Sequence, residues 1–312
     1  MSASWPSALR QWPFALLDGG LASELERCGC ELDDPLWSAK VLIDQPERVL
    51  EVHRRWLAAG ADVISTVSYQ ATIPGLLARG LSRDEAEALL RRSVALARAA
   101  VDEVGRASGS ASRPAMVAAS IGSYGAYLAD GSEYRGGYGL ARAALIEFHH
   151  DRLALLSEAS DLLAFETMPD VTELEAIAEL LDRVPGPPAW ISLSLAPDQL
   201  CLADGRALSD ALAPLRGHER VFAIGVNCLG PARVQGALLA LRELVDLPLV
   251  AYPNSGEAWI DRAWAGGELE VEAFAALARG WFEAGARLIG GCCRTRPEHL
   301  LALARVREQL AG

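Results

Sequence analysis

Short apolar segments rich in glycine and β-branched residues recur along this 312-residue chain, and helix-like stretches separate them. The clearest of these stretches cover residues 46–60 and 82–105; proline, serine or aspartate begins several of them and glycine ends several. Near-continuous apolar strands that alternate with amphipathic helices indicate a parallel sheet covered on both faces. The strand-like segments are residues 14–20, 62–69, 115–122, 162–168, 189–195, 221–228, 248–256 and 287–293.

The number of these units favours a closed sheet. Eight strand–helix units in roughly 300 residues are what a (β/α)8 barrel of TIM type requires, an α/β fold with eight parallel strands. An open doubly wound sheet is the alternative, but it usually carries an early G-x-G-x-x-G loop, which "DGGLASELE" (18–26) does not match. No linker or repeat divides the chain. We therefore predict one barrel domain that spans residues 1–312.

The charge balance and the cysteine content exclude several functional classes. The formal net charge is -12, so the chain repels nucleic acid overall, and no basic block offers a local exception. No run of about 18 apolar residues is present, so we expect no membrane span. The first twenty residues lack the apolar core of an export signal, and six cysteines are too few for a disulfide scaffold. We expect a cytoplasmic protein with reduced thiols.

Polar residues follow the ends of the predicted strands. Asp18, Glu166, Cys228 and Asn254 each lie at such an end, and the pair Cys292–Cys293 follows the last strand. In a barrel, the carboxyl ends of all strands meet at one mouth, where barrel enzymes carry their chemistry. The predicted topology therefore brings these distant residues together.

Three of these residues are cysteines, which suggests a metal site. Adjacent cysteines rarely form an ordinary disulfide. Consecutive strand residues point to opposite faces, so Cys292 and Cys293 share a site only if the chain bends, which Gly290 and Gly291 allow. With Cys228 they give three thiolates, which suit Zn²⁺ and leave its fourth position open, as in catalytic zinc sites. The alternative is that each is a small buried apolar side chain.

A zinc ion with three thiolates is negatively charged and suits a further sulfur better than water. A substrate thiol with a pKa near 8.5 is mostly protonated at neutral pH, and metal binding converts it to the nucleophilic thiolate. If the electrophile is a sulfonium methyl group, the two charges neutralise each other and a neutral thioether leaves.

A thiol-bearing amino acid also needs its ammonium and carboxylate groups bound. Asp18 and Glu166 supply negative charge, and backbone N–H groups around Gly19 and Gly20 suit the carboxylate. The alternative for Asp18 is an ordinary turn residue before two glycines. Glu166 lies within the apolar run "LLAFETM" (162–168), where burial without a partner is expensive.

The motifs "LLDGGLASELE", "STVSYQAT", "FETMPD", "GVNC", "YPNSGE" and "GGCCRT" resemble those of the homocysteine S-methyltransferases, above all the bacterial enzymes that use S-methylmethionine or S-adenosylmethionine. The resemblance covers about residues 14–306. It implies a barrel whose zinc is held by the three cysteines and receives the sulfur of homocysteine, with the sulfonium donor as second substrate. It also implies that Asp18 and Glu166 bind the amino group of homocysteine, and that residues 132–138 cover the donor side. Further residues assigned to the substrate pocket are Thr66, Ser68 and Asn227.

Two other functions remain open. One is a betaine–homocysteine methyltransferase, although such enzymes usually carry additional C-terminal sequence for oligomerisation; a chain that stops at Gly312 favours a monomer or weak dimer. The other is a non-catalytic sensor in which Cys292 and Cys293 form a vicinal disulfide.

The remaining cysteines and histidines are interpreted as having no catalytic role. Those cysteines lie away from the strand ends and are expected to be structural, whereas the histidines fall within helical stretches and are expected on solvated faces. The residues concerned are Cys28, Cys30, Cys201, His53, His149, His150 and His299.

Overall fold

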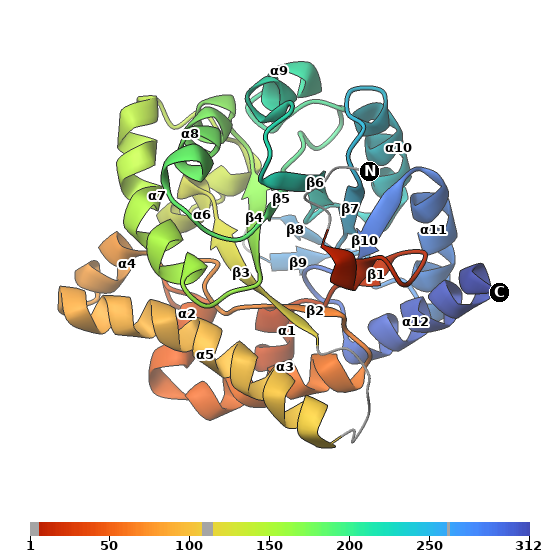
Figure 1. The fold of residues 1–312 in the computed structure, drawn as a ribbon, viewed down its shortest axis with the longest axis horizontal. Helices are drawn as coiled ribbons and strands as arrows, with labels where there is room; N and C mark the ends of the chain where they lie inside the picture. Colours follow the sequence, from red (N-terminus) through yellow and green to blue (C-terminus); the bar gives the residue numbers. More distant parts are fainter. Residues whose placement is uncertain (1–5, 108–114, 261–262) are drawn as a thin grey trace.

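The computed structural model describes residues 6–107, 115–260 and 263–312. In this part of the chain, eight strands form one parallel sheet in the order β1-β10-β7-β6-β5-β4-β3-β2 (Figure 1). All eight predicted strands are confirmed. They are β1 (Ala15–Leu16), β2 (Val63–Ser65), β3 (Met116–Gly122), β4 (Leu162–Met168), β5 (Ala189–Leu193), β6 (Val221–Asn227), β7 (Leu249–Tyr252) and β10 (Ala286–Ile289).

The sheet closes on itself between its two outer strands. Leu17 forms a parallel bridge with Val63, and the N–H of Asp18 donates to the carbonyl of Val63 at 3.0 Å. The predicted (β/α)8 barrel is therefore confirmed. A short antiparallel hairpin, β8 (Ala258–Ile260) with β9 (Ala263–Ala265), is inserted after β7.

Helices surround the barrel, as Figure 1 shows. The two clearest sequence predictions correspond to α3 (Pro46–Ala58), which begins at a proline, and α5 (Arg83–Ala107). The other α-helices are α1 (Leu21–Arg27), α2 (Ser38–Asp44), α4 (Ile73–Ala78), α6 (Tyr124–Leu128), α7 (Arg142–Ser157), α8 (Val171–Arg183), α9 (Leu208–Leu212), α10 (Pro231–Arg242), α11 (Val271–Glu283) and α12 (Pro297–Ala311). Short 3-10 helices are η1 (Ser7–Leu9), η2 (Ser132–Tyr134) and η3 (Ala213–Leu215).

The alternation of side chains along each strand separates two apolar layers. In β4, Leu163 and Phe165 belong to the layer between sheet and helices, whereas Leu162 and Ala164 belong to the cluster inside the barrel. This period of two places Glu166 on the inner side. A register shift at the start of β6 changes the parity there, so that Ile224 and Val226 face outward and Asn227 faces inward.

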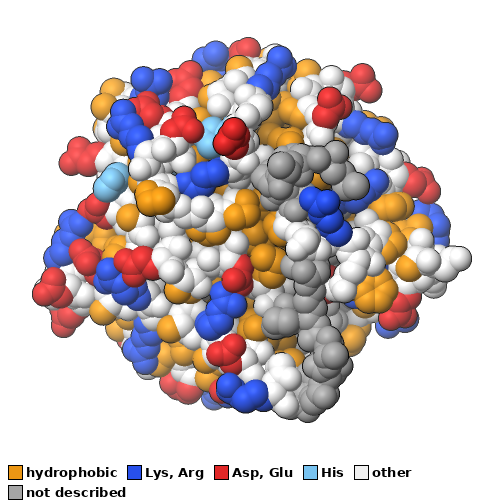
Figure 2. All heavy atoms as spheres, viewed as in Figure 1, with side chains coloured by type: hydrophobic (Ala, Val, Ile, Leu, Met, Phe, Trp, Pro, Cys, Tyr) orange, Lys and Arg blue, Asp and Glu red, His pale blue; other side chains and the backbone are white. Residues whose placement is uncertain are grey.

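The charged side chains of the surface and the composition of the helices are considered next. On the face seen in Figure 2, basic and acidic side chains are interspersed. Within the described residues, no helix combines the length and the apolar composition needed to cross a bilayer.

One prediction about the helices is wrong. His53, His149 and His299 are buried rather than solvated, and only His150 is exposed as expected. Burial lowers the pKa of His53 to about 4, because the charged imidazolium is poorly solvated there. Helical periodicity alone does not say which face of a helix a barrel buries.

Candidate metal centre and substrate pocket

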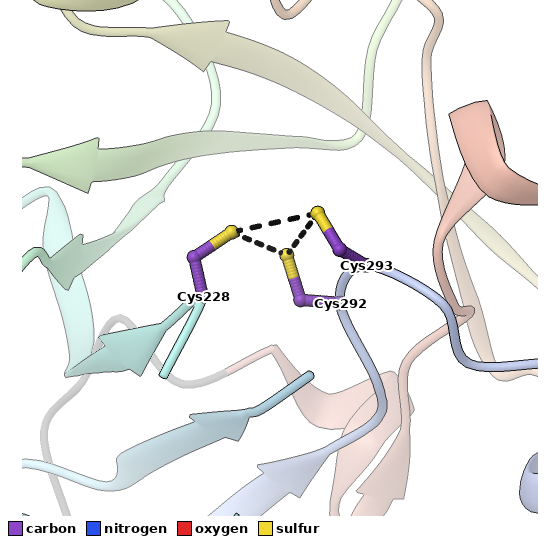
Figure 3. A group of neighbouring side chains, drawn as sticks. All are labelled: Cys228, Cys292 and Cys293. Carbon is purple, nitrogen blue, oxygen red and sulfur yellow. Dashed lines mark hydrogen bonds between the residues drawn. The ribbon is translucent and has the colours of Figure 1, made fainter. Parts of the chain in front are cut away.

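The three predicted cysteines converge at the barrel mouth. Cys228 directly follows β6, and Cys292 and Cys293 follow β10 after two glycines. The Sγ atom of Cys228 lies 2.7 Å from that of Cys292 and 3.9 Å from that of Cys293, and the adjacent pair is 3.9 Å apart (Figure 3). The remaining cysteines, Cys28, Cys30 and Cys201, lie outside this group.

The spacing of the sulfur atoms fits a tetrahedral zinc ion. Zn–S bonds of about 2.3 Å place two sulfur ligands about 3.8 Å apart. Two of the three separations match this value, and the Cys228–Cys292 separation needs to open by about 1 Å. The residues present can therefore hold the metal, with a fourth position available for a further ligand.

Backbone geometry, rather than side-chain choice alone, directs the sulfur atoms. Cys228 has a φ of 53° and Thr167, at the end of β4, has a φ of 57°, a region that non-glycine residues rarely occupy. Asn227 holds Thr167 in this conformation: its Oδ1 accepts from the Thr167 N–H at 2.9 Å, and its Nδ2 donates to the Thr167 hydroxyl at 2.8 Å. The predicted pocket residue Asn227 thus acts on the backbone.

Gly290 permits a close approach rather than a left-handed bend. A Cβ atom at this position would lie 2.6 Å from the carbonyl oxygen of Asp18 and 2.7 Å from the Cβ of Leu17. Gly291 donates its N–H to the same carbonyl at 3.1 Å. The two glycines therefore let the cysteine loop pack directly against the end of β1.

The sulfur cluster concentrates negative charge on Cys228. Hydrogen bonds from Cys292 and Cys293 lower the pKa of Cys228 well below its usual value, and Tyr134 and Thr167 also donate to it. Hydrogen bonds with Cys228 and with Cys293 raise the pKa of Cys292, which acts as a donor to Cys228. A cation among the three sulfurs would favour the thiolate form of all of them.

Asp18 is fully buried beside this cluster. Its Oδ2 accepts from the Ser65 N–H at 2.7 Å, and its Oδ1 accepts from the Tyr252 hydroxyl at 2.7 Å. Burial nevertheless raises the pKa of Asp18 to about 6, because these hydrogen bonds only partly replace hydration.

Glu166 is the second buried carboxylate of the mouth. The hydroxyl of Ser120 donates to its Oε2, and burial raises the pKa of Glu166 to about 8, with the charge of Asp18 contributing in the same direction. In the described part of the chain, neither Asp18 nor Glu166 forms an ion pair with a basic side chain. Two buried carboxylates without a cationic partner fit a cationic ligand.

Thr66 and Ser68 support Glu166 indirectly. Their hydroxyl oxygens lie 2.6 Å apart, Ser68 donates to the Ser120 carbonyl at 2.7 Å, and the Ser120 N–H donates to Thr66 at 3.0 Å. Both side chains are buried, so their hydrogen bonds hold the residue that contacts Glu166.

Gly19 and Gly20 are placed by close packing. A Cβ on Gly19 would overlap the ring of Trp56, and a Cβ on Gly20 would lie 2.6 Å from the Cys292 carbonyl. The N–H of Gly20 donates to the Thr295 hydroxyl at 3.1 Å, so it already has a partner.

Residues 123–138 form a segment beside the cluster that contains α6 and η2. Two carboxylates at the start of α8 bind it: Asp170 accepts from the Gly137 N–H at 2.9 Å, while Glu173 accepts from the Tyr124 N–H at 2.6 Å and from the Tyr138 hydroxyl at 3.2 Å. The hydroxyl of Ser123 accepts from the Ala126 N–H at 3.3 Å and caps α6. Both ends of the segment are thus tied to the helix that follows β4.

Sequence reasoning missed the buried network behind this segment. Nε2 of His149 lies 2.8 Å from Glu173, and its Nδ1 accepts from the Arg152 guanidinium at 2.8 Å. Arg152 also donates to the Gly122 carbonyl at 2.7 Å. The link from Arg152 through His149 to a glutamate of the next helix leaves no local sequence signal, because α7 carries many charged residues.

The proteins that this chain resembles are methyltransferases that act on homocysteine. A family model described as homocysteine S-methyltransferase matches residues 15–307. The chain is 46% identical over 301 residues to the homocysteine S-methyltransferase YbgG of Bacillus subtilis, covering 95% of each protein. Crystal structures of the homocysteine methyltransferase MmuM from Escherichia coli match with TM-scores of 0.87 for an oxidized form and 0.85 for a metallated form. In both cases identity is 45%, and the match covers 96% of this chain and 100% of the other.

Proposed function

Since this chain belongs to the homocysteine S-methyltransferase family, we propose that it transfers a methyl group from a sulfonium donor to the sulfur of homocysteine, giving methionine. The observation that carries the proposal is the convergence of three cysteine sulfurs with two buried carboxylates that lack basic partners. The cysteines can hold a metal ion that binds the sulfur of homocysteine, and the carboxylates can bind its ammonium group.

The carboxylates are proposed to bind the amino end of homocysteine. Asp18 is held by Ser65 and Tyr252, and Glu166 by Ser120, so both groups keep their orientation before the substrate arrives. Burial raises the pKa of Glu166 and repulsion from Asp18 adds to the rise, and an ammonium group between the two carboxylates opposes both effects. Binding of homocysteine is therefore coupled to loss of protons from this pair.

Cys228, Cys292 and Cys293 are proposed to hold Zn²⁺. A bound Zn²⁺ would favour the thiolate form of the homocysteine thiol, which is the nucleophile for the methyl group. The described residues that surround the sulfurs, Tyr134 and Thr167, donate hydrogen bonds to Cys228 and so position it. Family membership favours this enzymatic function over a thiol sensor.

The proposal is tested by methionine formation with zinc-loaded protein. Homocysteine is supplied with S-methylmethionine, S-adenosylmethionine or betaine in separate assays, and methionine is measured by mass spectrometry. We expect turnover with at least one sulfonium donor and loss of bound zinc and of activity in Cys228→Ala. Cys201→Ala, which removes a cysteine outside the cluster, is the matched control.

Two outcomes contradict the proposal. Undiminished methyl transfer by metal-free protein would exclude the role of the cysteines. Turnover with betaine alone would replace the sulfonium donor by a quaternary ammonium donor while leaving the acceptor side unchanged.

A further inference from the structure

One carboxylate near the sulfur cluster has no role in binding homocysteine as proposed above. Glu133 lies in η2, within the segment 123–138, and its Oε2 is buried without a hydrogen-bond partner. In the part of the chain that the structure describes, no ion pair joins Glu133 to a basic side chain. The neighbouring Arg135 instead lies 3.6 Å from Asp130. A buried carboxylate oxygen without a partner is expensive, and a cationic ligand would offset that cost.

The position of Glu133 relative to the cluster follows from its neighbours. The side chain of Tyr134, the next residue, donates a hydrogen bond to the sulfur of Cys228. Burial raises the pKa of the Tyr69 phenol, and the charges of Glu133 and Cys228 add to this rise, so the three groups lie within interaction range. The helix η2 also contacts β4, whose end carries Glu166 and Thr167.

The segment holds Glu133 firmly in this place. A Cβ on Gly125 would lie 2.5 Å from the Glu133 N–H nitrogen, which means that α6 and η2 are packed backbone to backbone. The N–H of Ser132 donates to Asp130 at 2.9 Å, and the N–H of Gly136 donates to the Ser132 carbonyl at 2.8 Å. Glu133 is therefore presented by an ordered turn.

The electrostatic environment of the Glu133 carboxylate favours the binding of a cation. Burial raises the pKa of Glu133 to about 7 and the negative charge of Cys228 adds to the rise, while a hydrogen bond from its own backbone N–H and the charge of Arg135 oppose it only in part. A positive ligand placed between the carboxylate and the sulfurs would oppose both effects. A sulfonium centre has no N–H to donate, so charge rather than hydrogen bonding must recognise it.

We propose that Glu133 binds the positive charge of the methyl donor and makes the site selective for donors of net positive charge. The inference rests on the proposed function, since it assigns the donor side of that same site. S-Methylmethionine and S-adenosylmethionine carry a sulfonium, an ammonium and one carboxylate, whereas betaine is net neutral. A fixed carboxylate beside the transferred methyl group favours the first two.

The test compares two ligands that differ by one methyl group and one charge. Dissociation constants of S-methylmethionine and of methionine are measured by calorimetry on the zinc-loaded protein without homocysteine, for wild type, E133Q and E133D. We expect E133Q to weaken binding of S-methylmethionine by roughly tenfold or more, the range of a partly desolvated charge interaction, with little change for methionine. E133D retains the charge and is expected to keep part of the preference.

The matched control is D130N. Asp130 lies in the same segment, is exposed, and caps Ser132 through one oxygen that asparagine also provides. Melting temperatures of all variants establish that they are folded.

Three outcomes separate the claims. If E133Q loses affinity for both ligands equally, or if D130N loses as much affinity for S-methylmethionine as E133Q does, the role of Glu133 is overturned and the proposed function still stands. If separate titrations of the same variants with homocysteine show weakened binding while the binding of S-methylmethionine is unchanged, Glu133 belongs to the acceptor side and the inference is overturned as well. Absence of methionine formation by wild type with every sulfonium donor would defeat the proposed function itself.

Discussion

The Sγ atoms of Cys228 and Cys292 lie 2.7 Å apart although 64 residues separate them in the chain. The adjacent cysteines, in contrast, are 3.9 Å apart at their sulfurs. The pair that is neighbouring in sequence is therefore not the pair that is closest in space. This relationship bears on both metal binding and oxidation.

Removal of metal followed by mild oxidation is expected to link Cys228 to Cys292. Their sulfurs already touch, whereas a vicinal bridge must distort the peptide between Cys292 and Cys293. Peptide mapping by mass spectrometry without reductant identifies the bridge, and zinc-loaded protein serves as the protected control. A dominant Cys292–Cys293 bridge would contradict the prediction.

The pH dependence of stability is expected to report Glu166. Its folded-state pKa of about 8 exceeds the ordinary 4.5, so the folded protein holds a proton between these values that the unfolded chain has lost. The free energy of unfolding therefore falls as pH rises from 4.5 to 8, by on the order of 4 kcal/mol for a shift of this size. Asp18, whose pKa is raised from 3.8 to about 6, adds a smaller decrease in the free energy of unfolding as pH rises between these two values.

Glu166→Gln should remove most of this dependence. Urea unfolding of metal-free wild type and variant at pH 5 and pH 8 gives the difference, and the exposed Glu31→Gln is the control. Parallel pH profiles for wild type and Glu166→Gln would show that Glu166 does not carry the effect. In the assay, the same variant should raise the KM for homocysteine by about tenfold or more, since it removes one charge from the ammonium site.

Glu173→Gln should loosen the segment 123–138. The change removes the negative charge that faces buried Arg152 through His149, and is expected to lower stability by roughly 3 kcal/mol. Because Glu173 also holds Tyr124 and Tyr138, the KM for the donor should rise more than the KM for homocysteine.

Glu175→Gln, on an exposed position of the same helix α8, is the matched control. Equal changes in both KM values would indicate that Glu173 acts on overall stability alone.

Gly290→Ala is expected to disturb the cysteine loop. The added Cβ would approach the Asp18 carbonyl to 2.6 Å, so the loop or β1 must shift, with a loss of roughly 1–3 kcal/mol and weaker zinc binding. Gly236→Ala, in α10 with open space around its Cβ, should be neutral or stabilising. Zinc affinity measured by competition with a chromophoric chelator checks the pair, and unchanged affinity in Gly290→Ala would refute the packing argument.

The sequence by itself determined the strands and the positions of the three cysteines. Continuous apolar runs that end in polar residues are local patterns, and barrel topology brings all strand ends to one mouth whatever lies between them. Cys228, Cys292 and Cys293 were therefore predictable as a cluster, and so was the inward position of Glu166 at the end of β4.

The tertiary structure alone decided how these residues are held. His149 is buried because α7 and α8 pack on each other, and its partner Glu173 lies 24 residues further along the chain. That Oε2 of Glu133 is buried without a hydrogen-bond partner likewise depends on the packing of η2 against β4. Burial and pairing are sums over contacts between distant segments, so no local pattern of residues encodes them.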